Sequence, residues 1–322
     1  MDVPFLPPTD ELRAVIETLS GPRGPLAGLV IALDREENPL ASSYPAEIVR
    51  CRCADGTELQ FLIKYMVTLS EGHRDHGMRG GLAYEAGIYQ QFLAPRVRPN
   101  FYGSCTTRGG VDLLILEFLP DCDRLDYAED DGTLLRVAAW LGRLHASMEP
   151  VVAAGKASGV REYDSEFFLG WARRTDAFAG DWHQRAPWLA ELCARFGSVA
   201  DVLLSATPTL VHGEFYPHNI LFRGTEIFAV DWESAATGAG ELDLVCLTEG
   251  WPPEFEQACD DEYQKARWPE GAPGRFASRA AAARVYMRIR WLGEHPAWTR
   301  HEDADSELNG LRCLVRRLDE LR

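Results

Sequence analysis

The stretch that decides the fold is LVHGEFYPHNILFRGTEIFAVDWE, residues 210–233. Its apolar segments are predicted to be short strands with a turn at residues 223–225, because Ile, Phe and Val favour strands and glycine favours turns. Three polar side chains, of Glu214, Asn219 and Asp231, are expected at the strand ends. An ordinary hairpin with polar turn residues explains any one of them. Together they indicate metal-assisted phosphate chemistry, because carboxylate and amide oxygens are ligands that Mg²⁺ prefers.

The order of these residues resembles a known catalytic segment. His-Gly-Glu, then Asn five residues after the glutamate, then an apolar strand closing in Val-Asp-Trp-Glu, is similar to the aminoglycoside phosphotransferase and choline kinase family, which has a protein-kinase-like fold. The resemblance implies that Asp231 and Asn219 coordinate Mg²⁺, and that Glu214 orients the acceptor hydroxyl and takes its proton. The family usually has Asp at the position of Glu214. One extra methylene moves a carboxylate by about 1.5 Å, so either the loop is adjusted to the longer side chain or transfer is slow.

Three neighbouring residues take supporting roles by the same resemblance. His212 would fix the loop by hydrogen bonds, and Glu233 would lie near the metal or the acceptor. Asp243 would brace the catalytic loop. A carboxylate stabilised by the dipole at a helix N-terminus also explains Asp243, and that role is compatible with bracing.

The N-terminal half is predicted to be an antiparallel meander with one inserted helix. Residue periodicity and turn signals predict a first helix at 9–20, a second helix at 81–93, and strands at 28–33, 46–53, 57–66, 100–105 and 111–119. After Pro120 the pattern is helical apart from the hairpin. We therefore predict an α+β, protein-kinase-like fold of two lobes. Residues 1–119 would form a five-stranded, nucleotide-binding N-lobe, and residues 120–322 a mainly helical C-lobe with the catalytic hairpin and the acceptor pocket.

Lys64 and Glu85 are predicted to complete the nucleotide site. Lys64 lies in an apolar strand, where a cation is conspicuous, and Glu85 lies on the helix that follows. In kinase-like folds such a lysine, paired with a helix carboxylate, holds the α- and β-phosphates of ATP. The alternative is a solvent-facing lysine on an edge strand and an exposed glutamate. The spacing shared with the family favours the ion pair.

Two other segments are predicted to contact the nucleotide, which would be ATP or GTP with Mg²⁺. The loop between the first two strands has no GxGxxG motif, so its phosphate contacts would come from backbone N–H groups and from Ser42 and Ser43. Backbone groups from Glu117 to Leu119, at the end of the last strand, would bind the adenine. A buried strand explains this second segment equally well, and only the resemblance favours the adenine contact.

Composition excludes several classes of partner. The net charge of −16 argues against nucleic acid and anionic membranes, which both require a basic patch. No apolar run approaches the roughly 20 residues that span a bilayer, and the acidic, proline-rich start is unlike a signal or transit peptide. The eight cysteines form no CxxC pair, which argues against a zinc or redox motif. We expect a cytoplasmic protein.

A strongly acidic run follows the predicted metal segment. Nine Asp and Glu residues, and no Lys or Arg, lie between Glu233 and Glu262. Such a run would attract a cationic amino sugar or another amine-bearing alcohol. A solvated acidic helix face explains it equally well.

These features predict an Mg²⁺- and ATP-dependent O-phosphotransferase that acts on a hydroxyl of a small, amine-bearing molecule, such as an aminoglycoside or another natural product. Antibiotic resistance is one role compatible with that activity. The alternative, suggested by Glu214, is a catalytically weak pseudokinase that binds nucleotide and serves as an interaction module. A protein kinase fits poorly, because the nine residues between Asp231 and Glu241 leave no room for a long activation segment.

Overall fold

The computed structural model describes residues 6–21, 24–26, 28–40, 44–66, 80–128, 130–180, 182–294, 297 and 304–321. The chain divides into two compact units. Unit 1 comprises Met1–Arg124 and Ile220–Ser234, and unit 2 comprises Leu125–Asn219 and Ala235–Arg322. The chain thus re-enters unit 1 at Ile220 and leaves it after Ser234. The predicted functional division between residues 119 and 120 assigned the same hairpin to the C-lobe.

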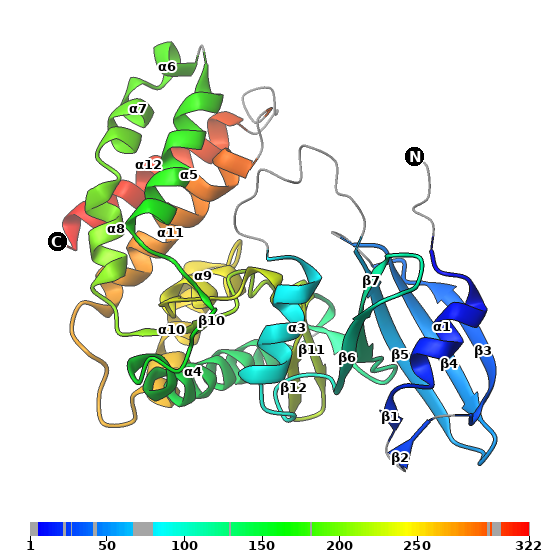
Figure 1. The fold of residues 1–322 in the computed structure, drawn as a ribbon. Helices are drawn as coiled ribbons and strands as arrows, with labels where there is room; N and C mark the ends of the chain where they lie inside the picture. The colour runs from blue at the N-terminus through cyan, green and yellow to red at the C-terminus, as the bar shows by residue number, and fades with distance from the viewer. Residues whose placement is uncertain are drawn as a thin grey trace. The chain divides into compact units, whose positions relative to one another are not determined.

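Unit 1 is built on a five-stranded antiparallel sheet with the strand order β3-β4-β5-β7-β6 (Figure 1). The strands are β3 (Val30–Glu37), β4 (Ala46–Cys53), β5 (Glu58–Tyr65), β6 (Phe101–Thr106) and β7 (Asp112–Glu117). Burial alternates along β5, where Leu59, Phe61, Ile63 and Tyr65 are buried, because successive side chains of a strand point to opposite faces. The five-stranded sheet confirms the predicted fold class.

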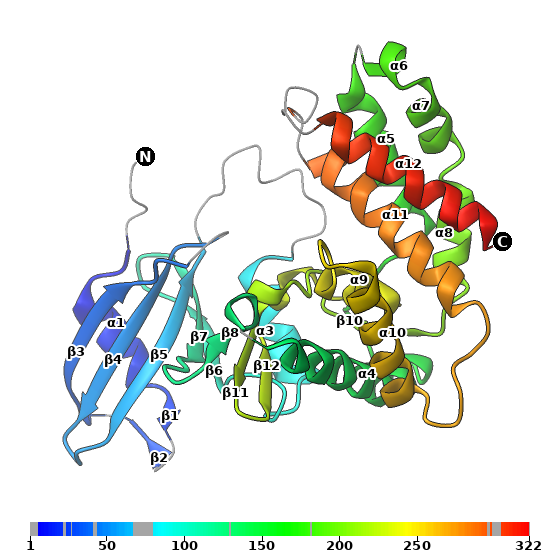
Figure 2. The same ribbon diagram turned by 180° about the vertical axis from the view of Figure 1, so that it is seen from behind.

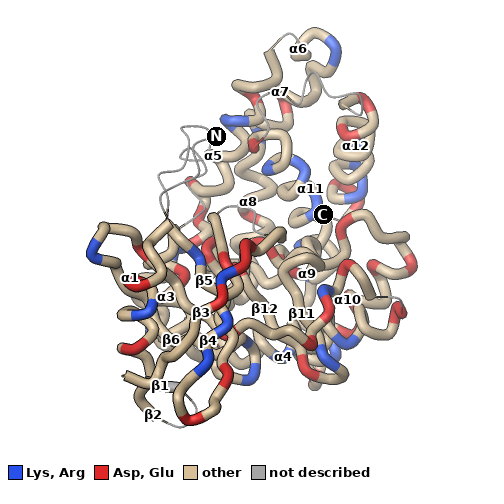
Figure 3. Tube along the Cα trace, turned by 90° about the vertical axis from the view of Figure 1, so that its right-hand side faces the viewer, with Lys and Arg blue, Asp and Glu red and all other residues tan. Residues whose placement is uncertain are grey.

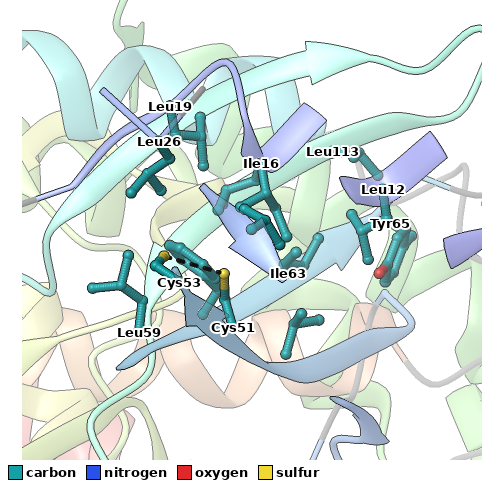
Figure 4. Packing of buried hydrophobic residues seen from close by; sticks show 14 residues of the cluster. Leu12, Ile16, Leu19, Leu26, Cys51, Cys53, Leu59, Ile63, Tyr65 and Leu113 are labelled. Carbon is teal, nitrogen blue, oxygen red and sulfur yellow. Dashed lines mark hydrogen bonds between the residues drawn. The ribbon is translucent and has the colours of Figure 1, made fainter. Parts of the chain in front are cut away.

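The main hydrophobic core of unit 1 lies between this sheet and α1 (Thr9–Ile16), as Figure 4 shows. Leu12 and Ile16 are one helical turn apart and are fully buried in the same cluster as Phe61. Cys51 and Cys53 pack there as free thiols, with their Sγ atoms 4.0 Å apart. A small hairpin follows α1, formed by β1 (Ser20–Gly21) and β2 (Gly24–Pro25).

The remaining elements in the described part of unit 1 are one helix, three short strands and a 3-10 helix. They are α3 (Gly81–Gln91), β8 (Asp123–Arg124), β11 (Ile220–Arg223), β12 (Glu226–Ala229) and the 3-10 helix η3 (Trp232–Ser234). Strand β11 pairs antiparallel with both β12 and β8, and Gly224 supplies the positive φ of 58° in the turn. Helix α3 packs against β6, β7 and η3.

Unit 2 is mainly helical. Its helices are α4 (Asp131–Ala153), α5 (Ser165–Ala179), α6 (Trp182–Arg185), α7 (Pro187–Ala194), α8 (Gly197–Leu204), α9 (Glu241–Leu247), α10 (Pro253–Arg267), α11 (Phe276–Glu294) and α12 (Ala304–Glu320), with the 3-10 helices η1 (Leu125–Tyr127) and η2 (Pro217–Asn219). A small sheet joins β10 (Pro208–Val211), β13 (Ala236–Ala239) and β9 (Arg161–Glu162). In the described residues, no helix has the length and apolarity that a bilayer crossing requires.

Helices α4 and α10 pack side by side (Figure 2). Their close approach requires a glycine at position 142, because a Cβ there would lie 2.5 Å from the carbonyl oxygen of Tyr263. Helix α4 begins after Asp130, whose side chain accepts a hydrogen bond from the backbone N–H of Thr133. This N-cap satisfies one of the N–H groups that a helix leaves without an internal partner.

Candidate active site

Within unit 1, the structure brings together three of the predicted site residues from three separate elements. Lys64 on β5 places its Nζ 2.9 and 3.0 Å from the two carboxylate oxygens of Glu85 on α3. The same Nζ lies 2.8 Å from Oδ1 of Asp231, just before η3. A single ammonium therefore bridges two carboxylates that are 146 residues apart in the chain, from position 85 to position 231.

The Lys64 ammonium is stable in this setting because of its two neighbours. Burial by itself lowers the pKa of a lysine, but the negative charges of Asp231 and Glu85 outweigh it and raise the pKa of Lys64 well above its ordinary value. Buried charges are tolerated when they are paired and hydrogen-bonded. The amine is therefore protonated at neutral pH.

Asp231 has an uncommon backbone conformation. Its φ is 70°, and it is one of two non-glycine residues with positive φ in the described part of the chain. This left-handed conformation costs on the order of 1–3 kcal/mol, and it persists where neighbouring contacts impose it. Two such contacts follow Asp231: the Trp232 N–H donates to Glu85 Oε1 at 3.3 Å, and the carbonyl of Glu233 accepts from the Gly80 N–H at 2.8 Å. Helix α3 therefore fixes the segment that carries the carboxylate.

The second set of predicted residues lies in unit 2, in the loop that follows β10. The carboxylate of Asp243, on α9, accepts hydrogen bonds from the backbone N–H groups of His212 at 2.6 Å and Gly213 at 2.9 Å. The ring of His212 in turn accepts from the N–H of Glu214 at 3.3 Å. Both side chains are thus hydrogen-bonded to the backbone of the loop, and their role in bracing it for catalysis stays a prediction.

A buried histidine supports Asp243 from α4. His145 Nε2 lies 3.2 Å from Oδ2 of Asp243, and His145 Nδ1 lies 2.8 Å from the hydroxyl of Tyr263. Burial lowers the pKa of His145, and the hydrogen bond to Asp243 opposes that shift only in part. The imidazole is therefore neutral near pH 7 and serves the packing of the loop.

The loop also has a partner that the sequence did not predict. Nη2 of Arg290, on α11, lies 2.5 Å from Oε1 of Glu214, and Nη1 donates to the carbonyl of Gly213 at 3.0 Å. Asn219 closes the loop through its side-chain nitrogen, which donates to the Glu214 carbonyl at 2.9 Å. Arg290 lies 76 residues after Glu214, in a helix without a recognisable motif. The one feature of the sequence that could have indicated such an arginine was the acidic run before α11, which contains no Lys or Arg. Acids that become buried require cations as partners.

Four of the nine acids of the run pair with arginines of α11. Figure 3 shows where the charged residues lie along the chain. The paired side chains are Arg279 with Glu241, Arg284 with Glu256 and Asp260, and Arg288 with Glu249. Five acids of the run are not buried, namely Glu249, Glu254, Glu256, Asp261 and Glu262. Part of the run is therefore a set of ion pairs with α11, and part of it is exposed on the surface.

The other predicted residues are placed less clearly. Ser42 and Ser43 lie outside the described residues. The N–H of Glu117 donates to the Asn100 carbonyl at 2.8 Å, so an adenine contact would have to use other atoms near Leu119. Glu233 is fully buried, so a ligand would reach its side chain only after neighbouring groups move.

The chain matches one known family. A sequence profile described as "Phosphotransferase enzyme family" matches residues 81–277, which is more than half of the 322 residues. The chain belongs to this phosphotransferase family. No curated protein sequence matches it.

Solved structures of similar fold include several members of the group that the motif resembles. A choline/ethanolamine kinase family protein from Mesorhizobium loti is 16% identical, with 98% of this chain and 99% of that chain covered and a TM-score of 0.59. Macrolide 2′-phosphotransferase MphH from Brachybacterium faecium is 19% identical, with 89% and 94% covered and a TM-score of 0.55. A mutant aminoglycoside 2′-phosphotransferase-IIIa in complex with GDP is 14% identical, with 89% and 92% covered and a TM-score of 0.59. At these identities the likeness establishes the kinase-like fold alone.

Proposed function

We propose that this phosphotransferase transfers the γ-phosphoryl group of ATP or GTP, with Mg²⁺, to a hydroxyl of a small amine-bearing molecule. The observation that carries the proposal is the position of Lys64 between Glu85 and Asp231. Phosphoryl transfer requires positioned cations and metal-binding carboxylates more than covalent chemistry. This arrangement occurs in a chain whose family membership already indicates phosphotransfer.

Lys64 and Glu85 would serve the nucleotide phosphates. An ammonium is a compact charge on a flexible stem, so it can contact a phosphate oxygen while Glu85 on α3 continues to bind it. The bond between Lys64 and Asp231 would then weaken, which releases the Asp231 carboxylate for its own ligand. The pairing in the structure therefore supports the proposal that this site binds a polyanion.

The residues present suit Mg²⁺. Asp231 supplies a carboxylate whose side chain is 21% exposed, and Asn219 donates through its amide nitrogen, so its amide oxygen is the atom offered for coordination. Among the described residues, no group of three or more His, Cys, Asp and Glu side chains could hold a metal. Mg²⁺ does not require such a cage, because in phosphoryl-transfer sites it is bound by one or two protein ligands together with phosphates and water. Bound there, the ion would neutralise charge on the transferred group.

Glu214 would act on the acceptor. Its carboxylate would accept a hydrogen bond from the acceptor hydroxyl, orient the oxygen and take its proton as the new bond forms. Its ordinary pKa differs from that of Asp by only about 0.4 unit, so the exchange of Asp for Glu changes reach and not acidity. Asp243 and His212 would keep the loop in place during this step.

The nature of the acceptor is inferred from the structural neighbours. These are described as acting on choline or ethanolamine, on macrolides and on aminoglycosides, and they support a small-molecule acceptor with an amine. The acidic run contributes less to this inference than its sequence suggested, because four of its nine acids pair with arginines of α11.

A pseudokinase is the second candidate, favoured by one observation. Oε1 of Glu214 is already engaged by a buried arginine, and an arginine that holds the carboxylate away from the acceptor hydroxyl would prevent transfer. Such a protein would bind nucleotide through unit 1 and transfer nothing.

An acceptor panel distinguishes the two. The protein is incubated with Mg·ATP or Mg·GTP and with amino sugars, choline-like amines, macrolides and hydroxylated secondary metabolites, and nucleoside diphosphate release is measured. We expect acceptor-dependent release that Asp231→Ala abolishes. Glu226→Gln, an exposed position on the same hairpin that pairs with Arg223, is the control and should retain activity. Nucleotide binding without turnover for any acceptor would favour the pseudokinase.

A further inference from the structure

We propose that Arg290 is a positioning residue for Glu214, and that their contact is how this loop uses Glu where the family usually has Asp. The inference rests on the proposed function, because it assigns a role to the carboxylate that would orient the acceptor. It concerns residues of unit 2 alone.

Arg290 holds both the backbone and the side chain of the loop. One guanidinium nitrogen donates to the Gly213 carbonyl at 3.0 Å, and another lies 2.5 Å from Glu214 Oε1. Because the guanidinium is planar and rigid, these two contacts set the distance between the loop backbone and the carboxylate. A longer side chain alone would leave that distance variable.

The arginine itself is held firmly. Glu294, one turn further along α11, accepts from Nε at 3.3 Å and from Nη2 at 3.2 Å. Arg290 is 2% exposed, so water does not compete for its donors. Burial alone lowers the pKa of Arg290, but Glu214 and Glu294 outweigh it and raise the pKa above the ordinary value. The guanidinium therefore stays charged and keeps its geometry.

The contact explains why the longer residue is required. Glu214→Asp would withdraw the carboxylate by about 1.5 Å, one carbon–carbon bond, and would lengthen the 2.5 Å contact beyond hydrogen-bond distance. A misplacement of about 1 Å can cost on the order of 10²-fold in rate. Restoring the residue that the family usually has should therefore impair this protein.

The same geometry permits the opposite role, which the experiment tests. If Arg290 only withholds the carboxylate, its removal frees Glu214 and raises kcat. If Arg290 positions the carboxylate, its removal lowers kcat. The sign of the change decides between the two roles.

The experiment measures kcat, and KM for nucleotide, with the best acceptor of the panel. The variants are Arg290→Gln, Arg290→Lys, Glu214→Asp and the double variant Glu214→Asp/Arg290→Gln. The control is Arg284→Gln, a similarly buried arginine of α11 that pairs with Glu256 and Asp260 and not with the loop. Thermal unfolding of each variant shows whether it is folded.

We expect Arg290→Gln to lower kcat by about 10²-fold, on the scale of a 1 Å misplacement, with little change in KM for nucleotide. Arg290→Lys should retain more activity than Arg290→Gln, because an ammonium can contact the Glu214 carboxylate but cannot also hold the Gly213 carbonyl. Glu214→Asp should lower kcat in the wild-type background and add little in the Arg290→Gln background, since two residues that act through one contact are not additive. Arg284→Gln should stay within about twofold.

Several outcomes would overturn the inference. They are an unchanged or higher kcat in folded Arg290→Gln or Arg290→Lys, losses that add in full in the double variant, or a kcat for Glu214→Asp equal to wild type. The last outcome decides the matter even if both Arg290 variants fail to fold. A wild-type protein without turnover for any acceptor refutes the proposed function, and the role of Arg290 with it.

Discussion

The two carboxylates that the proposed reaction uses are each paired with one cation, but the cations differ in kind. In unit 1, Asp231 is paired with Lys64, whose Nζ lies 2.8 Å away and is shared with Glu85. In unit 2, Glu214 is paired with Arg290 at 2.5 Å, and that arginine also binds the loop backbone. The side chain of Lys64 is 12% exposed and that of Arg290 is 3% exposed.

This difference indicates what each pair is for. A lysine ammonium has three donors on a flexible stem and can exchange one anion for another. An arginine fork bonded to a backbone carbonyl cannot leave without breaking the loop. The pair in unit 1 therefore suits a ligand that comes and goes, and the pair in unit 2 suits a carboxylate that must stay in one place.

The largest expected effect comes from removing the charge of Asp231, in the pair of unit 1 that suits an exchangeable ligand. Asp231→Asn should lower kcat by about 10³-fold or more, because the metal-binding charge is lost at the transferred group. Diphosphate release with the best acceptor measures it. Activity within tenfold of wild type would contradict the assignment of Asp231 to the metal.

Removal of the lysine should affect both stability and activity. Lys64→Met leaves Glu85 buried beside Asp231 without a cation, which should cost about 3–5 kcal/mol of unfolding free energy and about 10²-fold in kcat/KM for nucleotide. The double variant Lys64→Met/Glu85→Gln should recover most of the stability and none of the activity. Chemical denaturation and initial rates measure the two quantities. Recovery of activity in the double variant would show that Lys64 serves only to neutralise Glu85.

Weakening the hydrogen bonds that hold the loop of unit 2 should have a smaller effect. Asp243→Asn replaces one of the two acceptor oxygens for the His212 and Gly213 N–H groups by a donor. We expect a loss of about 1–3 kcal/mol in unfolding free energy and a fall in kcat of up to about 10²-fold. KM for nucleotide should be unchanged, since Lys64 and Glu85, which would bind the nucleotide phosphates, lie in unit 1. A selective rise in that KM would contradict the division of roles.

The smallest effect concerns pH. The pKa of His145 is lowered in the folded state, so between that pKa and the unfolded value of about 6.5 the unfolded chain binds the extra proton. Stability from this group is therefore complete above about pH 6.5 and is lost as the pH falls below it. The difference in unfolding free energy between wild type and His145→Gln, measured from pH 8 to pH 5, should shrink as the pH falls. A difference independent of pH would contradict a buried neutral imidazole.

Much of the fold was predictable because its signals are local. The strand at 46–53 was predicted with the bounds that β4 has in the structure, since its apolar residues are bounded by turn signals. Errors occur where pairing overrides the local pattern. The first strand was predicted to end at Leu33, but β3 continues to Glu37 because β4 offers partners as far as Glu47. The first helix ends at Ile16, before the hairpin that begins at Ser20.

The candidate site was predictable only where a motif marked it. Lys64, Glu85 and Asp231 were predicted from the spacing shared with the family, and the structure brings them together in unit 1. Their roles remain predictions. Arg290 was not predicted, because no local pattern distinguishes it from the other arginines of α11. Its partner is set by tertiary packing between segments 76 residues apart.

The return of the chain to unit 1 has a consequence for how the protein is made. Strand β8 pairs with β11, and Lys64 meets Asp231, yet both partners are translated about a hundred residues after the sheet is complete. When residue 124 has just been translated, the sheet of unit 1 is therefore present, but Lys64 and Glu85 still lack Asp231. A fragment that ends at residue 124 should therefore bind nucleotide poorly. To restore unit 1 in a split protein, residues 220–234 would have to be fused to that fragment.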